Sequence, residues 1–319
     1  MTLRQAILAT LAYHDIFNYP LTAIEIHKYF KKKASLKAVE NELKNFKSNS
    51  GFYTLPHREK IVKIRKTRIK FSEKKLKRAY FYTRLLKLIP TIRLVGISGA
   101  LAMQNSHKND DIDLVIICQK GTLWTTRFFA NIILSPFRRY PTSKHVADRA
   151  CLNIFLDEYD LKISSRNLYT AHEICQLKPI YDKQETYSRF TPVNASKNIK
   201  RSLSVYSKFI VSNKWVKKFL PNWQPLSSII PTPYPVIPAF TLTKEGKAGI
   251  QRKKKALVVS RLALCVETLL KKFQLLYMRS KVSSERIGKH QLFFHPQDTE
   301  ELILSKYRKK LKSLKITDS

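Results

Sequence analysis

The chain has 319 residues, of which 44% are hydrophobic, so it is long enough for two or three domains with a substantial core. Lys and Arg outnumber Asp and Glu by 60 to 23, which gives a formal net charge of +37. Such a charge favours a polyanionic partner such as nucleic acid, anionic lipid or nucleotide phosphates. The lysines are also spread along most of the chain, which equally suits an ordinary solvated surface.

The cysteines and the apolar segments narrow the class of protein. The four cysteines form no CxxC pair, which argues against a zinc site or a disulfide framework. The first apolar run is too short for a signal peptide, and no stretch is long enough for a transmembrane helix. These patterns predict a cytoplasmic protein with reduced thiols and no membrane span.

Residues 1–72 are predicted to form a winged-helix-like domain. Apolar residues at helical spacing indicate three short helices, and residues 51–68 then alternate like a β-hairpin with its turn near Pro56–Glu59. A basic wing would contact nucleic acid, whereas Glu40 and Glu42 in the third helix suit a phosphate-lined groove poorly, so a docking role is the alternative. The basic residues of the predicted wing are Arg58, Lys60, Lys63, Arg65, Lys66 and Arg68.

Residues 73–224 are predicted to form an α/β (α+β) domain with a small mixed sheet. A linker helix from Ser72 to Pro90 leads into it, and strand and helix patterns then alternate. Residues 225–319 are predicted to form a proline-rich arm and a helical C-terminal region. The strands of the α/β domain are expected at 93–99, 111–118 and 149–161, and the C-terminal helices at 253–279 and 299–319.

Two aspartates open the predicted strand 111–118. Residues i and i+2 of a strand point to the same face, so Asp111 and Asp113 present their carboxylates together. Close like charges destabilise a fold unless a cation lies between them, and Mg²⁺ is a hard cation that binds both carboxylates and nucleotide phosphates. Gly99 lies at the preceding strand-to-helix turn, where a missing side chain lets the backbone approach a phosphate.

The order of these residues resembles the signature of the DNA polymerase beta-like nucleotidyltransferase superfamily. Ile97-Ser98-Gly99-Ala100 leads through a spacer to Asp111-Ile112-Asp113-Leu114. The resemblance implies that Asp111 and Asp113 hold Mg²⁺, two ions in all, and that Ser98 and Gly99 seat the triphosphate of an NTP. It departs from the family at Ala100, where Ser or Gly is usual. The overall order also resembles an uncharacterised bacterial group with an N-terminal winged-helix-like domain.

The family takes a third carboxylate from a later strand. In the predicted strand 149–161, Asn153, Phe155 and Asp157 share a face, so Asp157 is the candidate third catalytic and metal-binding residue. The alternative is an acidic strand end exposed to solvent.

The resemblance implies an Mg²⁺-dependent nucleotidyltransferase. Such an enzyme would transfer a nucleoside monophosphate from an NTP to an acceptor hydroxyl and release pyrophosphate. The alternative is a non-catalytic winged-helix regulator or nucleotide sensor on a degenerate nucleotidyltransferase scaffold, which Ala100 would suit. No motif specifies the acceptor or the oligomeric state.

Overall fold

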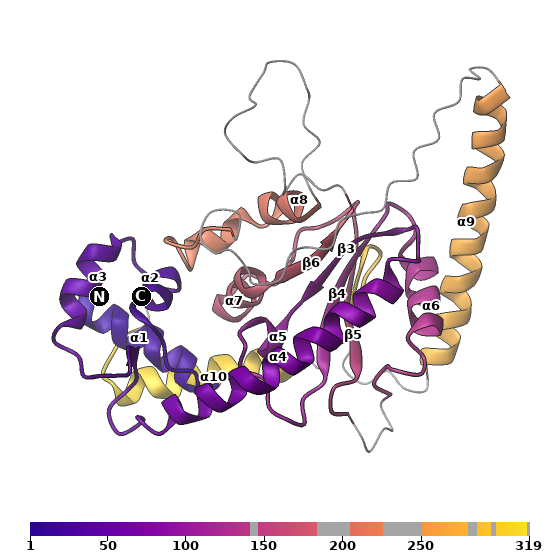
Figure 1. Cartoon of the computed structure of the whole chain (residues 1–319). Helices are drawn as coiled ribbons and strands as arrows, with labels where there is room; N and C mark the ends of the chain where they lie inside the picture. Colours follow the sequence, from indigo (N-terminus) through magenta and orange to yellow (C-terminus); the bar gives the residue numbers. More distant parts are fainter. Residues whose placement is uncertain (141–145, 184–204, 226–250, 280–285, 295–297, 318–319) are drawn as a thin grey trace, which may run out of the picture.

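A computed structural model describes residues 1–140, 146–183, 205–225, 251–279, 286–294 and 298–317 of the chain (Figure 1). The N-terminal part contains the three predicted helices, α1 (Leu3–Asp15), α2 (Ala23–Lys28) and α3 (Leu36–Leu43). Each begins at a capping residue, because Thr2, Thr22 and Ser35 accept hydrogen bonds from backbone amides of the first turn. The three helices predicted for this part of the chain are therefore confirmed.

The predicted hairpin is wrong in its second half. Two short antiparallel strands follow α3, β1 (Ser48–Asn49) and β2 (Phe52–Tyr53). The segment that was expected to be the returning strand instead begins the long helix α4 (Ile61–Leu86). No Gly or Pro interrupts this stretch, and its many Lys, Arg and Leu residues favour a helix, so helix propensity overrides the short alternation of apolar residues.

The main sheet is mixed, as the sequence predicts. The described strands lie in the order β6-β3-β4-β5-β8-β7. Strands β4 and β5 are parallel, and the other neighbouring pairs are antiparallel. The strands are β3 (Ile92–Ile97), β4 (Ile112–Cys118), β5 (Ala150–Asp157), β6 (Lys178–Asp182), β7 (Arg286–Ile287) and β8 (Gln291–Phe293).

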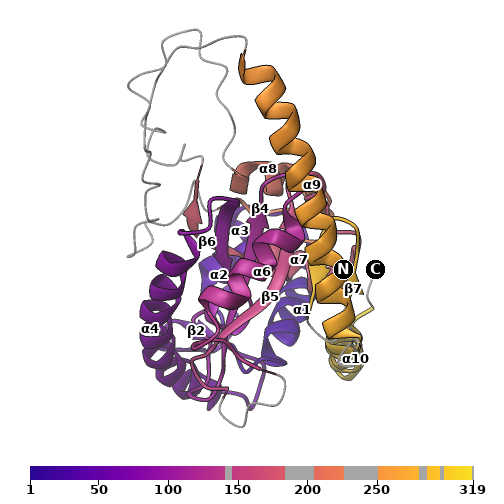
Figure 2. The same cartoon turned by 90° about the vertical axis from the view of Figure 1, so that its right-hand side faces the viewer.

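Helices cover both faces of this sheet (Figures 1 and 2). One core joins the sheet to α4, α6 (Leu123–Ile133) and α9 (Gln251–Met278). The other core joins the opposite face to α7 (Leu168–Gln176), α8 (Val205–Ser212) and α10 (Asp298–Ser313). This second core continues without interruption into the N-terminal helices. A one-turn helix, α5 (Gly99–Ala102), connects β3 to β4, and a 3₁₀-helix (Lys214–Lys218) follows α8.

The C-terminal region is interleaved with the rest of the chain. Strands β7 and β8 extend the main sheet, and α10 packs on α1 and α7. Lys310 of α10 forms an ion pair with Asp15 of α1 at 2.5 Å. The predicted boundary at residue 72 falls inside α4. Most of the predicted proline-rich arm, residues 226–250, lies outside the described residues, whereas α9 and α10 agree with the predicted C-terminal helices.

The length and polarity of the helices bear on the predicted absence of a membrane span. In the described part of the chain, none of the helices is both long enough and apolar enough to cross a bilayer. Many of the lysines lie on exposed surfaces of helices, and several of them lie along α4.

Two buried histidines hold the N-terminal helices against the sheet domain. His14 of α1 and His172 of α7 are each only 2% exposed, and their rings are 5.0 Å apart. The ring of His172 stacks on Tyr13 at 4.0 Å. Burial lowers the pKa of His14 to about 4 and lowers that of His172 as well, so both rings are neutral at pH 7.

This buried pair predicts a loss of stability in mild acid. An unfolded histidine binds a proton near pH 6.5, whereas folded His14 does so only near 4, so stability falls as the pH drops through that window. The free energy of unfolding is expected to decrease by about 2 kcal/mol from pH 7 to pH 5 through His14 alone. Denaturant melts at both pH values measure this. His172→Phe should reduce the pH dependence, and His57→Asn, at an exposed position, should leave it unchanged.

Candidate metal centre

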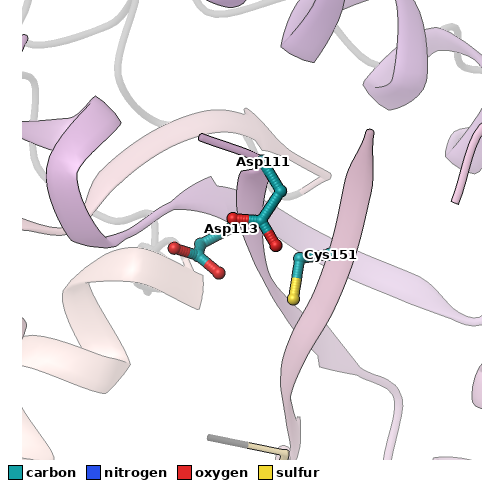
Figure 3. A group of neighbouring side chains, drawn as sticks. All are labelled: Asp111, Asp113 and Cys151. Atoms are coloured by element: carbon teal, nitrogen blue, oxygen red, sulfur yellow. The ribbon is translucent and has the colours of Figure 1, made fainter. Parts of the chain in front are cut away.

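Three side chains that could hold a cation meet where β4 and β5 begin. Asp111 immediately precedes β4, Asp113 lies within it, and Cys151 faces Asp113 across the parallel β4–β5 pair. One ligand atom from each side chain can be chosen so that all three lie within 4.8 Å of one another (Figure 3). The structure therefore brings the two predicted aspartates together, as the shared strand face requires.

The electrostatics of this cluster are unfavourable without a cation. Burial, followed by the charge of Asp111, raises the pKa of Asp113 to about 7. Burial also raises the pKa of the Cys151 thiol, which therefore stays protonated at neutral pH and hydrogen-bonds to Asp113. Near neutral pH Asp113 is thus poised between its neutral and its charged form.

A single arginine partly offsets this charge. The Arg139 guanidinium donates to Asp111 Oδ2 at 2.7 Å, and this contact raises the pKa of Arg139. The backbone N–H of Arg139 donates to the carbonyl of Ala150 at the start of β5, which fixes this segment beside the cluster. Asp111 is therefore paired with a cationic side chain, whereas Asp113 hydrogen-bonds to the neutral thiol.

A buried lysine fixes both loops that lead into the site. Lys75 of α4 is 1% exposed, and its Nζ donates to the carbonyl oxygens of Lys108 and Asp110 and to Asp148 Oδ1 at 2.7 Å. One loop ends at Asp111, and the other runs into β5 just before Cys151. Lys75 is therefore a positioning residue, because it holds the loops that precede the strands carrying Asp113 and Cys151.

Gly99 touches the site directly. Its φ of +61° lies in the left-handed region, and a Cβ built there would stand 2.7 Å from Asp113 Oδ2. Glycine is thus required both by the backbone conformation and by the position of the carboxylate. Gly99 and Asp113 line a cavity of about 230 Å³, together with Tyr13, Phe17 and Tyr19 of the N-terminal part.

Ser98 does not line the same cavity as Gly99. Ser98 is 4% exposed and lines a second, more apolar cavity, whereas Gly99 and Ala100 line the one that holds Asp113. The prediction that the Ser98 side chain seats a triphosphate is therefore not supported by its placement. Only its backbone N–H approaches the pair, donating to the Asp113 carbonyl at 3.1 Å.

Asp157 lies away from the cluster. It pairs with Cys118 at the far end of β5, whereas Asp113 pairs with Cys151 at the near end. At about 3.3 Å per residue, the six positions between Cys151 and Asp157 place it roughly 20 Å away. Its carboxylate accepts hydrogen bonds from the backbone amides of Gly121 and Tyr159. The prediction that Asp157 completes a metal triad is wrong. Asp157 lies at the far end of β5, and the register shift at Asn153 places it beside Cys118, on the opposite face of the sheet from Asp113.

Sequence reasoning missed four residues at or near the site. Cys151 is placed beside Asp113 by the register between β4 and β5, and no local sequence pattern reveals that register. Lys75 was detectable, because it lies at helical spacing beside the apolar residues Leu76, Ala79 and Leu86 of its helix. Arg139 and Glu173 gave no signal. Glu173 of α7 lines the same cavity as Asp113, and burial raises its pKa to about 7.

The chain was compared with protein-family models, curated proteins and solved structures, and no match was found. Any functional assignment therefore depends on the geometry of this site and on the sequence pattern around it.

Proposed function

We propose that the protein is an Mg²⁺-dependent nucleotidyltransferase that uses Asp111 and Asp113. The observation that carries this proposal is the contact between Gly99 and Asp113, which joins the predicted phosphate turn to the carboxylate pair. The adjoining cavity of about 230 Å³ offers the rings of Tyr13, Phe17 and Tyr19 to a nucleotide base.

The donor set suits Mg²⁺ better than a soft metal. Mg²⁺ is commonly held by one or two carboxylates together with substrate phosphates and water, and Asp111 and Asp113 of this chain would provide the carboxylates. A protonated thiol is a poor ligand for a hard cation, so Cys151 would act as a hydrogen-bond donor. When bound, the cation would neutralise the carboxylates and the phosphates. Arg139 would then be free to turn from Asp111 to a phosphate oxygen.

The proposed reaction forms one bond to phosphorus and breaks another. The oxygen of an acceptor hydroxyl forms a bond to the α-phosphorus of the NTP, and the bond from that phosphorus to the bridging oxygen of the β-phosphate breaks. Pyrophosphate leaves with the bond electrons, and the hydroxyl proton passes to a base. Glu173 suits this role, because its raised pKa of about 7 matches the operating pH.

A non-catalytic nucleotide sensor is the second candidate. Cys151 occupies the position opposite Asp113, and Arg139 already pairs with Asp111, so two features of an efficient metal site are altered. Calorimetry with Mg²⁺ and each NTP, followed by a pyrophosphate-release assay, separates the two functions. Release that requires Asp113 supports the transferase, and nucleotide binding without release supports the sensor.

We also propose a polyanion-binding surface, although not the predicted basic wing. Three arginines of that segment serve the fold: Arg65 forms a bidentate pair with Glu25 at 2.7 Å, Arg58 pairs with Asp15, and Arg68 donates to the carbonyl of Phe17. The lysines instead form a stripe along one exposed side of α4, with spacings of three or four residues. This lysine stripe is Lys63, Lys66, Lys70, Lys74 and Lys77, and it spans about 21 Å at 1.5 Å per residue.

If the lysine stripe follows a phosphate backbone, Lys63→Ala with Lys70→Ala should weaken binding to duplexes of unrelated sequence by similar factors. The slope of log affinity against log salt should become shallower by about 0.9 for each phosphate that is no longer neutralised. Gel shifts across a salt series measure both quantities. The matched control is Lys217→Ala with Lys218→Ala, which removes the same charge from an exposed position elsewhere. Equal weakening in the two double variants would rule out the lysine stripe as the binding surface, and no binding at low salt would remove nucleic acid as a partner.

A further inference from the structure

A second cavity lies beside the carboxylate pair, on the same face of the sheet. Its volume is about 140 Å³. Val115, two residues after Asp113 on β4, forms part of its floor, and Leu156 of β5 continues it. Ile174 of α7 and Phe209 of α8 lie against the opposite side. The walls are therefore mostly apolar, and the cavity follows the strand face that presents the two aspartates.

Two buried polar atoms in this cavity have no hydrogen-bond partner. Ser98 is 4% exposed and Asn153 is 3% exposed, and both line the cavity. Within the described part of the chain, neither Ser98 Oγ nor Asn153 Oδ1 has a hydrogen-bond partner. Leaving such a group unpaired costs about 1–3 kcal/mol, and a bound ligand with a hydroxyl group would remove that cost.

The placement of Asn153 depends on an irregularity of the sheet. Leu114 pairs with Leu152 and Val115 with Ile154, so Asn153 is an extra residue on β5 at this point. Such bulges redirect a side chain and are common next to functional sites. Here the bulge places Asn153 among the residues that line the cavity.

The second cavity adjoins the one that holds Asp113. Tyr169, Glu173 and Thr299 line both of them. The backbone N–H of Ser98 donates to the Asp113 carbonyl, so Ser98 and Asp113 lie opposite each other on neighbouring strands. A ligand hydroxyl bound to the Ser98 side chain would therefore lie beside Asp113. A ligand in the second cavity would therefore present its polar end beside the phosphate turn and the carboxylates.

The lining also indicates the charge and size of the ligand. Two of the ionisable side chains that line it are already engaged: Glu300 accepts from Ser165 at 2.8 Å, and the Arg286 guanidinium lies 5.3 Å from the Phe293 ring centre. Another, Glu173, is an acid and would repel an anion. An uncharged ligand thus fits better than an ionised one. An apolar cavity of about 150 Å³ is large enough for a benzene ring, so the ligand is the size of a single ring.

We propose that this cavity, which we call the acceptor cavity, binds the acceptor of nucleotidyl transfer as an uncharged, largely apolar alcohol of about one ring. Its hydroxyl would donate to Asn153 Oδ1 and accept from Ser98 Oγ. The identification of the ligand as the acceptor rests on the proposed nucleotidyltransferase function, whereas the existence of the binding site does not.

Two probes of matched shape test the site in the full-length, metal-free protein. Benzyl alcohol carries the hydroxyl, and toluene lacks it. Titrations followed by amide chemical shifts should show benzyl alcohol binding at least about tenfold more tightly than toluene, because only the alcohol satisfies the two buried polar atoms. Combining Ser98→Ala with Asn153→Leu should bring the ratio of the two dissociation constants to about one, and thermal melts of the double variant verify its fold.

The outcomes separate this inference from the proposed function. Equal binding of the two probes, saturable binding of neither, or a preference that survives in the double variant overturns the acceptor cavity. Asp113→Asn should leave the alcohol preference unchanged while it removes Mg²⁺-dependent nucleotide binding. If the wild-type protein prefers the alcohol but binds no Mg²⁺-nucleotide, the proposed function is wrong and the acceptor role falls with it. Benzyl alcohol-dependent release of pyrophosphate from wild-type protein with Mg²⁺ and NTP would support both.

Discussion

Replacing Asp113 with asparagine is expected to abolish nucleotidyl transfer. The substitution keeps the shape of the side chain and removes the charge that would hold the cation, so pyrophosphate release should fall at least about a hundredfold. Asp111→Asn should have a similar effect, since both carboxylates belong to one cluster. A continuous pyrophosphate assay with each NTP and Mg²⁺ measures the decrease.

The same substitution should stabilise the metal-free protein in alkaline solution. Asp113 ionises near 7 when folded but near 3.8 when unfolded, so its charge penalises folding increasingly between these values and fully above them. Asparagine removes a penalty on the order of 2–4 kcal/mol, and the melting temperature at pH 8 should rise by several degrees. The gain should shrink as the pH falls and disappear near pH 4.

Asp160→Asn is the matched control for this pair of effects. Asp160 is exposed and lies beyond the far end of β5, so its amide variant should retain activity and show no alkaline stabilisation. Full activity in Asp113→Asn would disprove the metal site. An unchanged melting temperature at pH 8 would instead show that neither burial nor the charge of Asp111 penalises ionised Asp113 in the folded protein.

Gly99→Ala is expected to damage the site and the fold together. The new methyl group would stand 2.7 Å from Asp113 Oδ2, so the carboxylate must move away from its cation-binding position. We expect Mg²⁺ affinity to fall at least about tenfold, as measured by calorimetry. The free energy of unfolding should fall by about 2–4 kcal/mol, because the left-handed backbone conformation adds its own cost.

Gly51→Ala isolates the backbone part of this effect. Gly51 has a φ of +77°, but a Cβ built there meets nothing within 4 Å. Its alanine variant should therefore lose about 1–2 kcal/mol of stability and no Mg²⁺ affinity. The steric part is tested by Gly99→Ala in an Asp113→Ala background, where Gly99→Ala should cost less stability than it does in the wild-type chain. Strict additivity would show that Gly99 and Asp113 do not touch.

Much of the fold could be predicted from local patterns. Capped helices at Thr2, Thr22 and Ser35 and the apolar strands around Val95 and Ile116 carry clear periodicity, and the mixed sheet follows from their order. The start of α4 was mispredicted, because a few residues of alternation look the same whether the chain continues as a strand or as a helix. Length decides between them, and the stretch after Ile61 is long and unbroken.

Only those parts of the candidate site that are close together in the sequence could be predicted from it. The shared face of Asp111 and Asp113 follows from strand geometry, and the closeness of Gly99 follows from the turn that joins β3 to β4. Cys151 depends on which strands are neighbours and in which register, which is a property of tertiary structure. The same reason explains Asp157, which lies at the wrong end of β5 and, because of the register shift at Asn153, on the opposite face from Asp113.

The packing of α10 against α1 determines when the N-terminal helices can complete their core during protein synthesis. Tyr307 of α10 contacts Tyr13 edge-on at 5.6 Å, and Asp15 pairs with Lys310 across 295 positions of sequence. At 5–20 residues per second, the ribosome needs roughly 15–60 s to make that intervening chain. For that time the part of α1 that α10 covers has no permanent partner, although α2 and α3 can already pack on α1. The first helices to emerge thus belong to a core that is among the last parts of the described fold to be completed.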